Sequence, residues 1–265
     1  MTLNPPGQYA DDRQLRARQR FWLYQDPQFD IVNWVLDLAG PSPGMRVLDA
    51  GCGNGWYLRG LADRGVTAVG CDLSPGMLRA AADQAGDQAG HPAVLNADVT
   101  ALPLRDGAVD VALAIHMLYH VPDRPAALRE LRRVTAPGGV FVAVTNGARH
   151  TRALRDLIER AAGEQNPGWR MRPAIHAFTA ENAAGQLGAA FETVTLVRPA
   201  QEPPVVIRDA AVAADYVASL GTHHDDETTR PWADVVTGVR RQVQAVIDEQ
   251  GAFVTSGDLV AFLCR

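Results

Sequence analysis

Five short apolar segments, each separated from the next by a helical or turn pattern, constrain the fold of this chain most strongly. The segments are rich in Val, Leu and Ala, and they cover 45–50, 66–72, 93–98, 109–116 and 138–145. Helical patterns lie between them at 56–65, 74–86 and 124–134. Nearly continuous apolar strands that alternate with helices are typical of a parallel sheet covered on both faces. The sequence therefore predicts one α/β core with a doubly wound sheet.

The pattern changes on either side of this region. Residues 31–38 carry apolar side chains at helical spacing and predict an amphipathic helix that ends at Gly40. After Asn146 we expect helices over 151–162 and 179–190 and a strand over 191–197. Segment 254–265 predicts a tight hairpin around Ser256, Gly257 and Asp258 that delivers an apolar C-terminal strand.

Residues 201–251 form an insertion between the late strands, with two helices bounded by prolines. Long insertions of this kind are usually functional, so we interpret this one as a lid over a substrate. The expected division is a helical cap over 1–40, a core over 41–200 and 252–265, and the lid over 201–251. The apolar side chains of the lid favour a small or partly apolar substrate; they are Val212, Tyr216, Leu220, Val235, Val239 and Val243.

Composition excludes several kinds of chemistry. The chain has no lysine, which rules out Schiff-base, lysine general-base and Walker-lysine mechanisms. Its net charge of -5 argues against a nucleic-acid partner, which normally requires a basic surface. No apolar run is long enough for a membrane span, and the polar first residues do not read as a signal peptide. Three scattered cysteines fit a reducing compartment, so we expect a cytoplasmic protein.

The turn after the first strand, VLDAGCGNGWYLRG, contains Gly51, Gly53 and Gly55. A dinucleotide-binding G-x-G-x-x-G loop would carry its third glycine at position 56, where this chain has Trp56. The spacing is therefore wrong for a loop that holds a pyrophosphate. Small residues at this turn would still let a ligand lie against bare backbone amides.

Carboxylates follow three of the predicted strands, and ligands of such sheets bind beyond the carboxyl ends of the strands. Asp49 ends the first strand, Asp72 the second and Asp98 the third. The carboxylate of Asp72 can accept hydrogen bonds from a ribose diol, and that of Asp98 from the amino group of an adenine. The fourth strand ends in AIHMLYH, an apolar wall with a polar rim.

Within 44–146, four stretches follow in a fixed order: VLDAGCGNG, GCDLSPGML, NADVTALPLRDGAVDVALAIHMLYHVPD and ELRRVTAPGGVFVAV. As a set they resemble class I S-adenosylmethionine-dependent methyltransferases, particularly the group similar to quinone-biosynthesis and small-molecule methyltransferases. The resemblance implies a Rossmann-like sheet of seven strands with a reversed C-terminal strand. It also implies S-adenosylmethionine as the cofactor and S-adenosylhomocysteine as the product.

The resemblance further assigns roles by position. It implies backbone contacts to the methionine moiety around Asp49, Gly51, Cys52 and Gly53. It places the ribose hydroxyls on Asp72, and the adenine beside Leu73, Met77, Asp98 and Val99. It sets Ile115 and His116 behind the sulfonium. In this family the N-terminal helix often covers the cofactor, so Tyr9 or one of Arg13, Arg16 and Arg20 would meet the methionine carboxylate. The alternative for these arginines is a solvated helical face.

Candidate bases follow the fourth strand. His116 would act as a general base or contact the substrate, Tyr119 either shares that side or packs structurally, and His120 anchors the loop or acts as a base. His176 and the histidines of the lid are further candidates. We expect no metal, because the His116–His120 spacing lacks the glutamate of a zinc helix. The cluster over 223–227 is either a solvated acidic turn or the edge of the lid facing the substrate.

The sequence thus predicts a methyltransferase that acts on an oxygen, nitrogen or carbon atom of a small organic acceptor. One alternative is an rRNA or tRNA methyltransferase that uses the arginines in 129–133 and 149–172. Another is a cofactor-binding protein that no longer methylates. Whether the protein forms a homodimer stays open.

Overall fold

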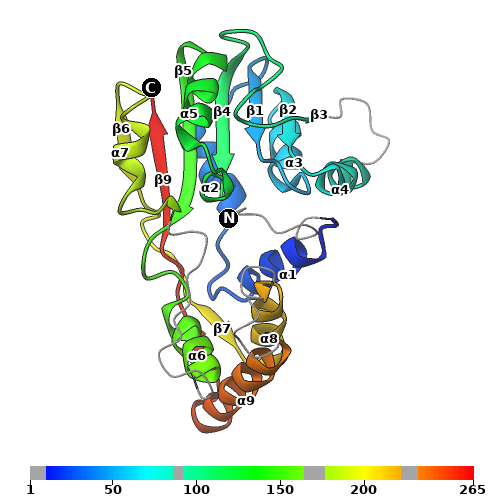
Figure 1. Cartoon of the computed structure of the whole chain (residues 1–265), viewed down its shortest axis with the longest axis vertical. Coiled ribbons are helices and arrows are strands. Elements are labelled where there is room, and N and C mark those ends of the chain that lie inside the picture. The colour runs from blue at the N-terminus through cyan, green and yellow to red at the C-terminus, as the bar shows by residue number, and fades with distance from the viewer. Residues whose placement is uncertain (1–9, 86–91, 164–176, 222–231) are drawn as a thin grey trace.

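The computed structural model describes residues 10–85, 92–163, 177–221 and 232–265 (Figure 1). A sheet of seven strands has the order β3-β2-β1-β4-β5-β9-β6. Its strands are β1 (Arg46–Ala50), β2 (Thr67–Asp72), β3 (Ala93–Asn96), β4 (Val109–Ile115), β5 (Thr135–Asn146), β6 (Val194–Val197) and β9 (Leu259–Cys264). Strands β1 to β5 pair in parallel, whereas β9 runs antiparallel to both β5 and β6. The predicted doubly wound α/β fold, including its reversed C-terminal strand, is confirmed.

Both faces of this sheet are covered, which explains why its strands are apolar at successive positions. Ala112 and Ala114 of β4 point into one hydrophobic cluster, which includes side chains of α5 (Arg124–Val134) and α7 (Ala183–Leu187). Val111, Leu113 and Ile115 point into a cluster on the opposite face, with α2 (Ile31–Ala39), α3 (Trp56–Ala62) and Leu78 of α4 (Pro75–Ala85). The alternation along β4 follows from the two-residue period of a strand.

Local signals place the helix ends where the sequence suggested. The side chain of Asp30 accepts a hydrogen bond from the Asn33 amide and begins α2, which ends at Gly40 in the left-handed conformation (φ 63°). Asp123 begins α5 in the same way by accepting from the Ala126 amide. Two elements are shorter than expected: α7 covers only 183–187 and β6 only 194–197.

A third hydrophobic cluster lies beyond the carboxyl ends of the parallel strands. It combines α6 (Arg152–Gly163), α8 (Ala210–Ala218) and α9 (Trp232–Gln250) with Phe21 of α1 (Arg13–Trp22) and with the two-stranded sheet of β7 (Val205–Ile207) and β8 (Phe253–Thr255). We call these elements the helical lobe. In Figure 1 the arrowheads of β4 and β5 point down towards this lobe. The two helices predicted in the 201–251 insertion are present, and α1 and α6 pack with them.

The apolar side chains of the insertion have a different role from the one expected. Val235, Val239 and Val243 of α9 are buried in the lobe's own core, against α6 and α8. Val212 and Leu220 pack against the same cluster. The interpretation that these faces are available to an apolar substrate is therefore wrong for them.

The predicted C-terminal hairpin is also wrong. β8 pairs with β7 in the helical lobe, whereas β9 pairs with β5 and β6 in the large sheet. The connecting residues bind other segments: the side chain of Glu202 accepts from the Leu259 amide, and Asp258 accepts from Arg198. Phe253 packs in the lobe and Leu259 in the main core, so burial at both ends draws the two strands into different sheets.

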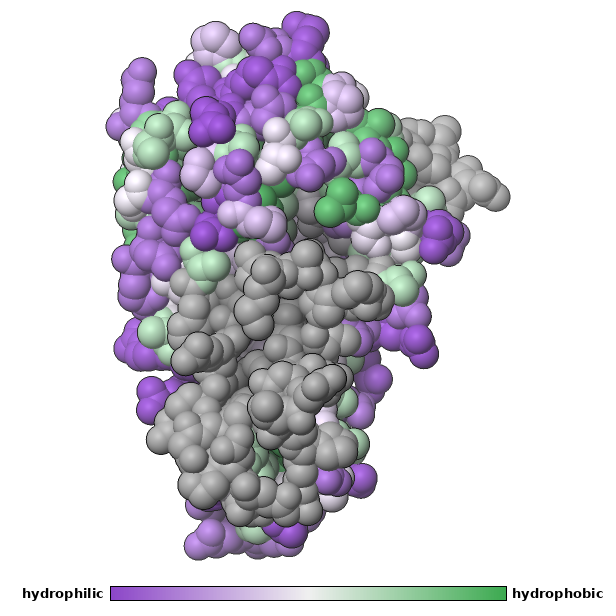
Figure 2. All heavy atoms as spheres, in the orientation of Figure 1, coloured by the Kyte–Doolittle hydropathy of each residue, from purple (hydrophilic) through white to green (hydrophobic). Residues whose placement is uncertain are grey.

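None of the helices in the described part of the chain is both long and apolar enough to cross a membrane. In the upper part of the face shown in Figure 2, hydrophilic side chains predominate and hydrophobic ones are scattered among them.

Candidate active site

A large cavity lies between the carboxyl ends of the parallel strands and the helical lobe. Its volume is about 2750 Å³, whereas pockets that bury one small ligand usually measure about 300–1,000 Å³. The cavity is open and also extends along α3 as far as Val66, so only part of this volume lies at the strand ends. Thirteen residues predicted from the sequence line it: Asp49, Gly51, Cys52, Gly53, Asp72, Leu73, Met77, Asp98, Val99, Ile115, His116, Tyr119 and His120. The predicted Tyr9, His176 and the 223–227 cluster lie outside the described residues.

The glycine turn between β1 and α3 packs too closely to accept side chains. Gly51 has φ 72°, and a Cβ atom there would lie 2.8 Å from the side chain of Met117. Gly55 has φ 82° and directly precedes Trp56, the first residue of α3. At its glycines the turn thus brings backbone without a side chain to the floor of the cavity.

The amides of this turn are not bare, however, which corrects the sequence-based expectation. Those of Gly51 and Cys52 both donate to the Cys71 carbonyl, at 2.7 and 2.9 Å. The Gly53 amide donates to Asp72 Oδ2 at 2.9 Å. Parallel pairing of β1 with β2 places these acceptors within reach. A ligand on this turn meets compact, internally bonded backbone.

Asp72 holds the turn and the start of the next helix together. Its Oδ2 accepts from Gly53, and its Oδ1 accepts from the Ser74 amide at 2.8 Å. Burial raises its pKa, and the amide hydrogen bonds oppose that shift. Each carboxylate oxygen has a second lone pair, so Asp72 can still accept from two hydroxyl groups of a ligand. Leu73 follows at the rim with 64% of its surface exposed.

Asp49 is a buried carboxylate on the cavity wall, with 1% of its surface exposed. Its Oδ2 has no hydrogen-bond partner. Burial, and secondarily the charge of Asp72, raises its pKa to about 7. An unpaired buried anion is costly, and a cationic ligand would relieve that cost. This buried carboxylate therefore fits a ligand with positively charged groups, such as the ammonium and sulfonium groups of S-adenosylmethionine.

Asp98 and two apolar residues line the cavity beyond the end of β3. Asp98 Oδ1 accepts from both the amide and the hydroxyl of Thr100, at 2.8 and 2.7 Å. Met77 and Val99 are buried in the wall beside it. An apolar slot with a carboxylate at its edge suits a planar base with an amino group.

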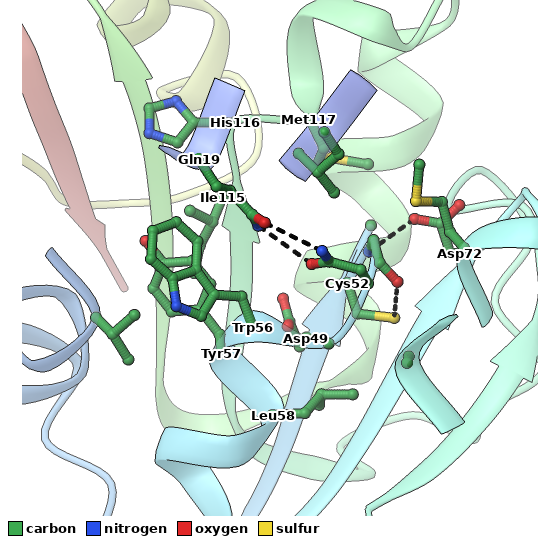
Figure 3. A pocket seen from close by; sticks show the side chains of 18 of the residues that line it. Gln19, Asp49, Cys52, Trp56, Tyr57, Leu58, Asp72, Ile115, His116 and Met117 are labelled. Carbon is green, nitrogen blue, oxygen red and sulfur yellow. Dashed lines mark hydrogen bonds between the residues drawn. The ribbon is translucent and has the colours of Figure 1, made fainter. Parts of the chain in front are cut away.

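Trp56 and Tyr57 begin α3, and both line the cavity. Their rings are 6.1 Å apart. The Tyr57 hydroxyl is buried without a hydrogen-bond partner, and burial, with a smaller effect of the Asp49 charge, raises its pKa. In the view of Figure 3, Tyr57 and Trp56 lie beside Asp49. These aromatic residues therefore shape the pocket in addition to starting the helix.

The buried thiols of this region are not nucleophiles. Burial raises the pKa of Cys52 far above its usual range and that of Cys71 to about 12. Both therefore carry their protons at neutral pH.

His116 and Met117, the residues after β4, lie above Asp49 in the view of Figure 3. His116 has a left-handed backbone (φ 53°), and its amide donates to the Val144 carbonyl at 2.9 Å. Burial lowers its pKa to about 4, so its imidazole is neutral at pH 7. The short 3₁₀ helix Leu118–His120 follows, with the rings of Tyr119 and His120 4.5 Å apart.

Helix α1 covers the glycine turn, as the N-terminal segment was expected to do. Its Leu15, Arg18, Gln19 and Trp22 line the cavity. Arg13 and Arg16 pair instead with Asp11 and Asp12 on the surface. The hypothesis that either one faces a ligand carboxylate therefore has no support from their contacts.

Sequence reasoning missed the residues that line the cavity near the helical lobe. They are Trp22, Asn146, His150, Glu202 and Leu259. Asn146 is the last residue of β5, just as Asp72 is the last residue of β2, so the rule used for the acids would have found it. Trp22 carries no such signal, because only the packing of the lobe brings it here. Tyr216, which was named among the apolar side chains of the insertion, does line the cavity. Among the described residues, no cluster of three or more His, Cys, Asp and Glu side chains has the geometry of a metal site.

Comparisons with known proteins agree with this geometry. Residues 48–143 match the family model described as a methyltransferase domain. A malonyl-[acyl-carrier protein] O-methyltransferase of Serratia marcescens is 36% identical over 159 residues, which make up 58% of this chain and 61% of that protein. A demethylmenaquinone methyltransferase of Beutenbergia cavernae is 40% identical over 108 residues, or 41% of this chain and 43% of that one. The matches thus span less than two thirds of either relative.

The fold has solved counterparts. The phosphoethanolamine N-methyltransferase 2 of Haemonchus contortus, in complex with S-adenosyl-L-methionine, aligns with a TM-score of 0.58 and 17% identity. The alignment covers 98% of this chain and 58% of that one.

Proposed function

Because this chain belongs to the class I S-adenosylmethionine-dependent methyltransferases, we propose that it binds that cofactor in the cavity and methylates a small organic acceptor there. The unpaired, buried carboxylate of Asp49 is the observation that carries the proposal. A cavity floor with an anion that lacks a partner calls for a cationic ligand, and S-adenosylmethionine is one. When bound, it supplies a methyl group activated by a positively charged sulfur.

We call the part of the cavity beyond the carboxyl ends of β1, β2 and β3 the cofactor half. In this half Asp49 would attract the cationic end of the ligand, and Asp72 would accept from its ribose hydroxyls. Asp98 would accept from the adenine amino group between Met77 and Val99. Gly51 and Gly53 would let the ligand approach the backbone, and Ile115 and His116 would close the side facing the acceptor.

The acceptor half is the part near the helical lobe. Its residues have two tasks in such a transfer: to align the attacking atom with the methyl group and to keep water away. The lobe supplies the enclosure, because α1 and α8 contribute Trp22 and Tyr216 to the wall. A base is required only when the acceptor must lose a proton. His116, Tyr119 and His120 were proposed for that task from sequence, and all three line the cavity.

The acceptor is proposed to be a small molecule or a small group carried into the cavity. The two relatives named above act, according to their names, on malonyl-[acyl-carrier protein] and on demethylmenaquinone.

An RNA acceptor is less well supported. Arginines that were considered for such binding are paired with acids of the protein itself: Arg133 with Glu130 and Asp106, and Arg152 with Asp156. Neutralised arginines contribute little to phosphate binding.

Calorimetric titration tests the proposal. S-adenosylmethionine and S-adenosylhomocysteine should bind in the micromolar range, and NADH should not bind. Binding of NADH with neither of the others would overturn the proposal. Cofactor binding without formation of S-adenosylhomocysteine from any acceptor would instead identify a family member that no longer methylates.

A further inference from the structure

Three short segments connect the seven-stranded sheet to the helical lobe (Figure 1). Residues 147–151 link β5 to α6, residues 198–204 link β6 to β7, and residues 256–258 link β8 to β9. We call these three segments the joint. They lie far apart in the sequence, so side-chain contacts between them help to fix the lobe on the sheet.

Asp258 binds the last of these segments to the first. It is 4% exposed, and its Oδ2 accepts a hydrogen bond from the Arg149 amide at 3.0 Å. Its carbonyl accepts from the Gly147 amide at 2.8 Å. A Cβ atom at Gly147 would overlap with the carboxylate of Asp258. The turn after β5 therefore packs directly on this carboxylate and has no room for a side chain at the point of contact.

The charge of Asp258 is balanced within the joint. Arg198 Nη1 lies 2.6 Å from Asp258 Oδ1, and Arg149 Nε lies 3.6 Å from Oδ2. Burial acts to raise the pKa of Asp258, but the hydrogen bonds from Arg149 and Arg198 outweigh it and hold the pKa below its usual value. The carboxylate is therefore charged at neutral pH, and its ion pair with Arg198 ties the second segment to the third.

Glu202 repeats this arrangement between the second and third segments. Its Oε2 accepts from the Leu259 amide at 2.8 Å. A Cβ atom at Gly257 would overlap with its Oε1, just as one at Gly147 would overlap with Asp258. Neither glycine has a left-handed φ. Both glycines therefore serve the close approach of a carboxylate from another segment and not an unusual backbone conformation.

The joint also forms part of the cavity wall. Four residues in it or next to it line the cavity near the lobe: Asn146, His150, Glu202 and Leu259. Asn146 and Leu259 face each other at the end of the pairing between β5 and β9. His150 lies in the turn held by Asp258, and its ring is 5.2 Å from that of Trp22. A shift of the joint would therefore move this wall.

We propose that Asp258 and Glu202 are positioning residues for the acceptor half of the cavity. Asp258 acts through the turn that carries His150, and Glu202 acts through the amide of Leu259. Together they hold Asn146, His150 and Leu259 in place; we call these three residues the acceptor wall. The inference rests on the proposed methyl transfer, because that proposal assigns this part of the cavity to the acceptor.

Gly147→Ala tests the role of Asp258 without removing a charge. The added methyl group should displace the carboxylate, so that the turn opens and water reaches His150. Burial is the main cause that lowers the pKa of His150 to about 3. His116 and Arg155 act in the same direction, and Asp258 opposes them. In NMR spectra of wild-type protein, the imidazole of His150 should therefore not titrate between pH 8 and pH 5. In Gly147→Ala its pKa should rise by about two units or more, into that range.

Asp258→Ala separates the contact from the charge. Loss of the negative charge alone would lower the pKa of His150 further, whereas loss of the contact should raise it. We expect a rise. Gly147→Ala combined with Asp258→Ala should behave like Asp258→Ala alone, because the overlap is then gone. Glu249→Ala, on the exposed end of α9, is the control for charge. A lower pKa of His150 in Asp258→Ala, or an unchanged one in Gly147→Ala, would show that the turn keeps its place without Asp258.

Arg198→Gln is a milder variant that leaves the turn itself unaltered. It removes the ion pair with Asp258 and keeps the hydrogen bond from the Arg149 amide. The Arg149 amide should exchange its hydrogen with water several-fold faster than in wild type, and the pKa of His150 should rise less than in Gly147→Ala. Unchanged exchange at Arg149 would show that the ion pair does not hold the turn.

Gly257→Ala tests Glu202 in the same way. Its methyl group should move the carboxylate away from the Leu259 amide, which should then exchange with water at least about ten-fold faster. Glu202→Gln should change this exchange only a few-fold, because the side-chain oxygen of glutamine can still accept the hydrogen bond. Equal exchange at Leu259 in Gly257→Ala and wild type would show that Glu202 does not hold the start of β9.

Titration with S-adenosylhomocysteine separates this inference from the proposed function. Each variant should bind it within about two-fold of wild type, because the joint borders the acceptor half, and retained affinity shows that the variant is folded. A loss of affinity in every variant would show that the joint supports the whole fold and would overturn its specific role in the acceptor wall. Failure of wild-type protein to bind would refute the proposed function, whereas the pKa of His150 and the amide exchange are measured without the cofactor.

Discussion

The side-chain amides of Gln19 and Asn54 hydrogen-bond to each other in both directions, with N···O distances of 3.1 Å each (Figure 3). Gln19 belongs to α1, which packs with the helical lobe, and Asn54 belongs to the glycine turn. The pair therefore joins the lobe directly to the segment proposed to hold the cofactor.

This pair should couple the lobe to cofactor binding. Gln19→Ala and Asn54→Ala should each weaken S-adenosylhomocysteine binding several-fold, because each leaves a polar partner unsatisfied. The double variant should be little worse than either single one, with a coupling free energy of about 1 kcal/mol in a double-mutant cycle. Strictly additive losses would mean that the two side chains act independently.

Asp49→Asn should stabilise the cofactor-free protein while weakening cofactor binding. The pKa of Asp49 rises from 3.8 to about 7 on folding, so the folded state binds more protons between these values and wild-type stability falls as pH rises through them. The variant cannot titrate there. The melting temperature of the variant minus that of wild type should therefore increase from pH 4 to pH 7 and remain positive above pH 7. A difference that is independent of pH would contradict the raised pKa.

Asp72→Ala should weaken S-adenosylmethionine binding by about ten-fold or more, since it removes a charged acceptor for two hydroxyl groups. It also frees the amides of Gly53 and Ser74, so the turn should loosen. Asp83→Ala, on the exposed side of α4, is the matched control for charge. Unchanged affinity in calorimetry would show that the second-strand acid does not hold the ligand.

Gly51→Ala should impair folding and binding for two separable reasons. A methyl group at this position meets Met117, and φ 72° is strained for any residue with a Cβ atom. Adding Met117→Gly removes the Cβ, Cγ and Cε atoms that the new methyl group meets, so the double variant, compared with Met117→Gly alone, should recover part of the lost melting temperature. The remaining deficit should correspond to about 1–2 kcal/mol. Complete recovery would assign the whole cost to the contact.

Histidines should govern the loss of stability in acid. Burial lowers the pKa of His116 to about 4 and that of His150 to about 3, from 6.5. The unfolded state therefore binds more protons below pH 6.5, and the stability from these groups is lost as pH falls towards 3. Between pH 7 and pH 5, His150→Gln should lose less of its melting temperature than wild type does. An equal loss would mean that His150 stays accessible to protons in the folded protein.

The sequence was most informative where the structure depends on the pattern of neighbouring residues. The apolar strands, the turn at Gly51 and the acids Asp49 and Asp72 follow from patterns within a few residues. The position of His150 does not, because it depends on hydrogen bonds from its turn to Asp258, far along the chain. The C-terminal hairpin failed for the same reason: Phe253 and Leu259 are buried in different clusters, and no local pattern shows this.

The division of β8 and β9 between two sheets limits how this protein can be rebuilt. A chimera that exchanges only 201–251 would separate β7 from β8, its partner in the two-stranded sheet, and would leave Phe21 without its contact on Tyr216. Exchange of substrate preference between relatives would therefore require three chain segments to be moved together. The helical lobe is one packing unit in space although its segments are scattered along the chain.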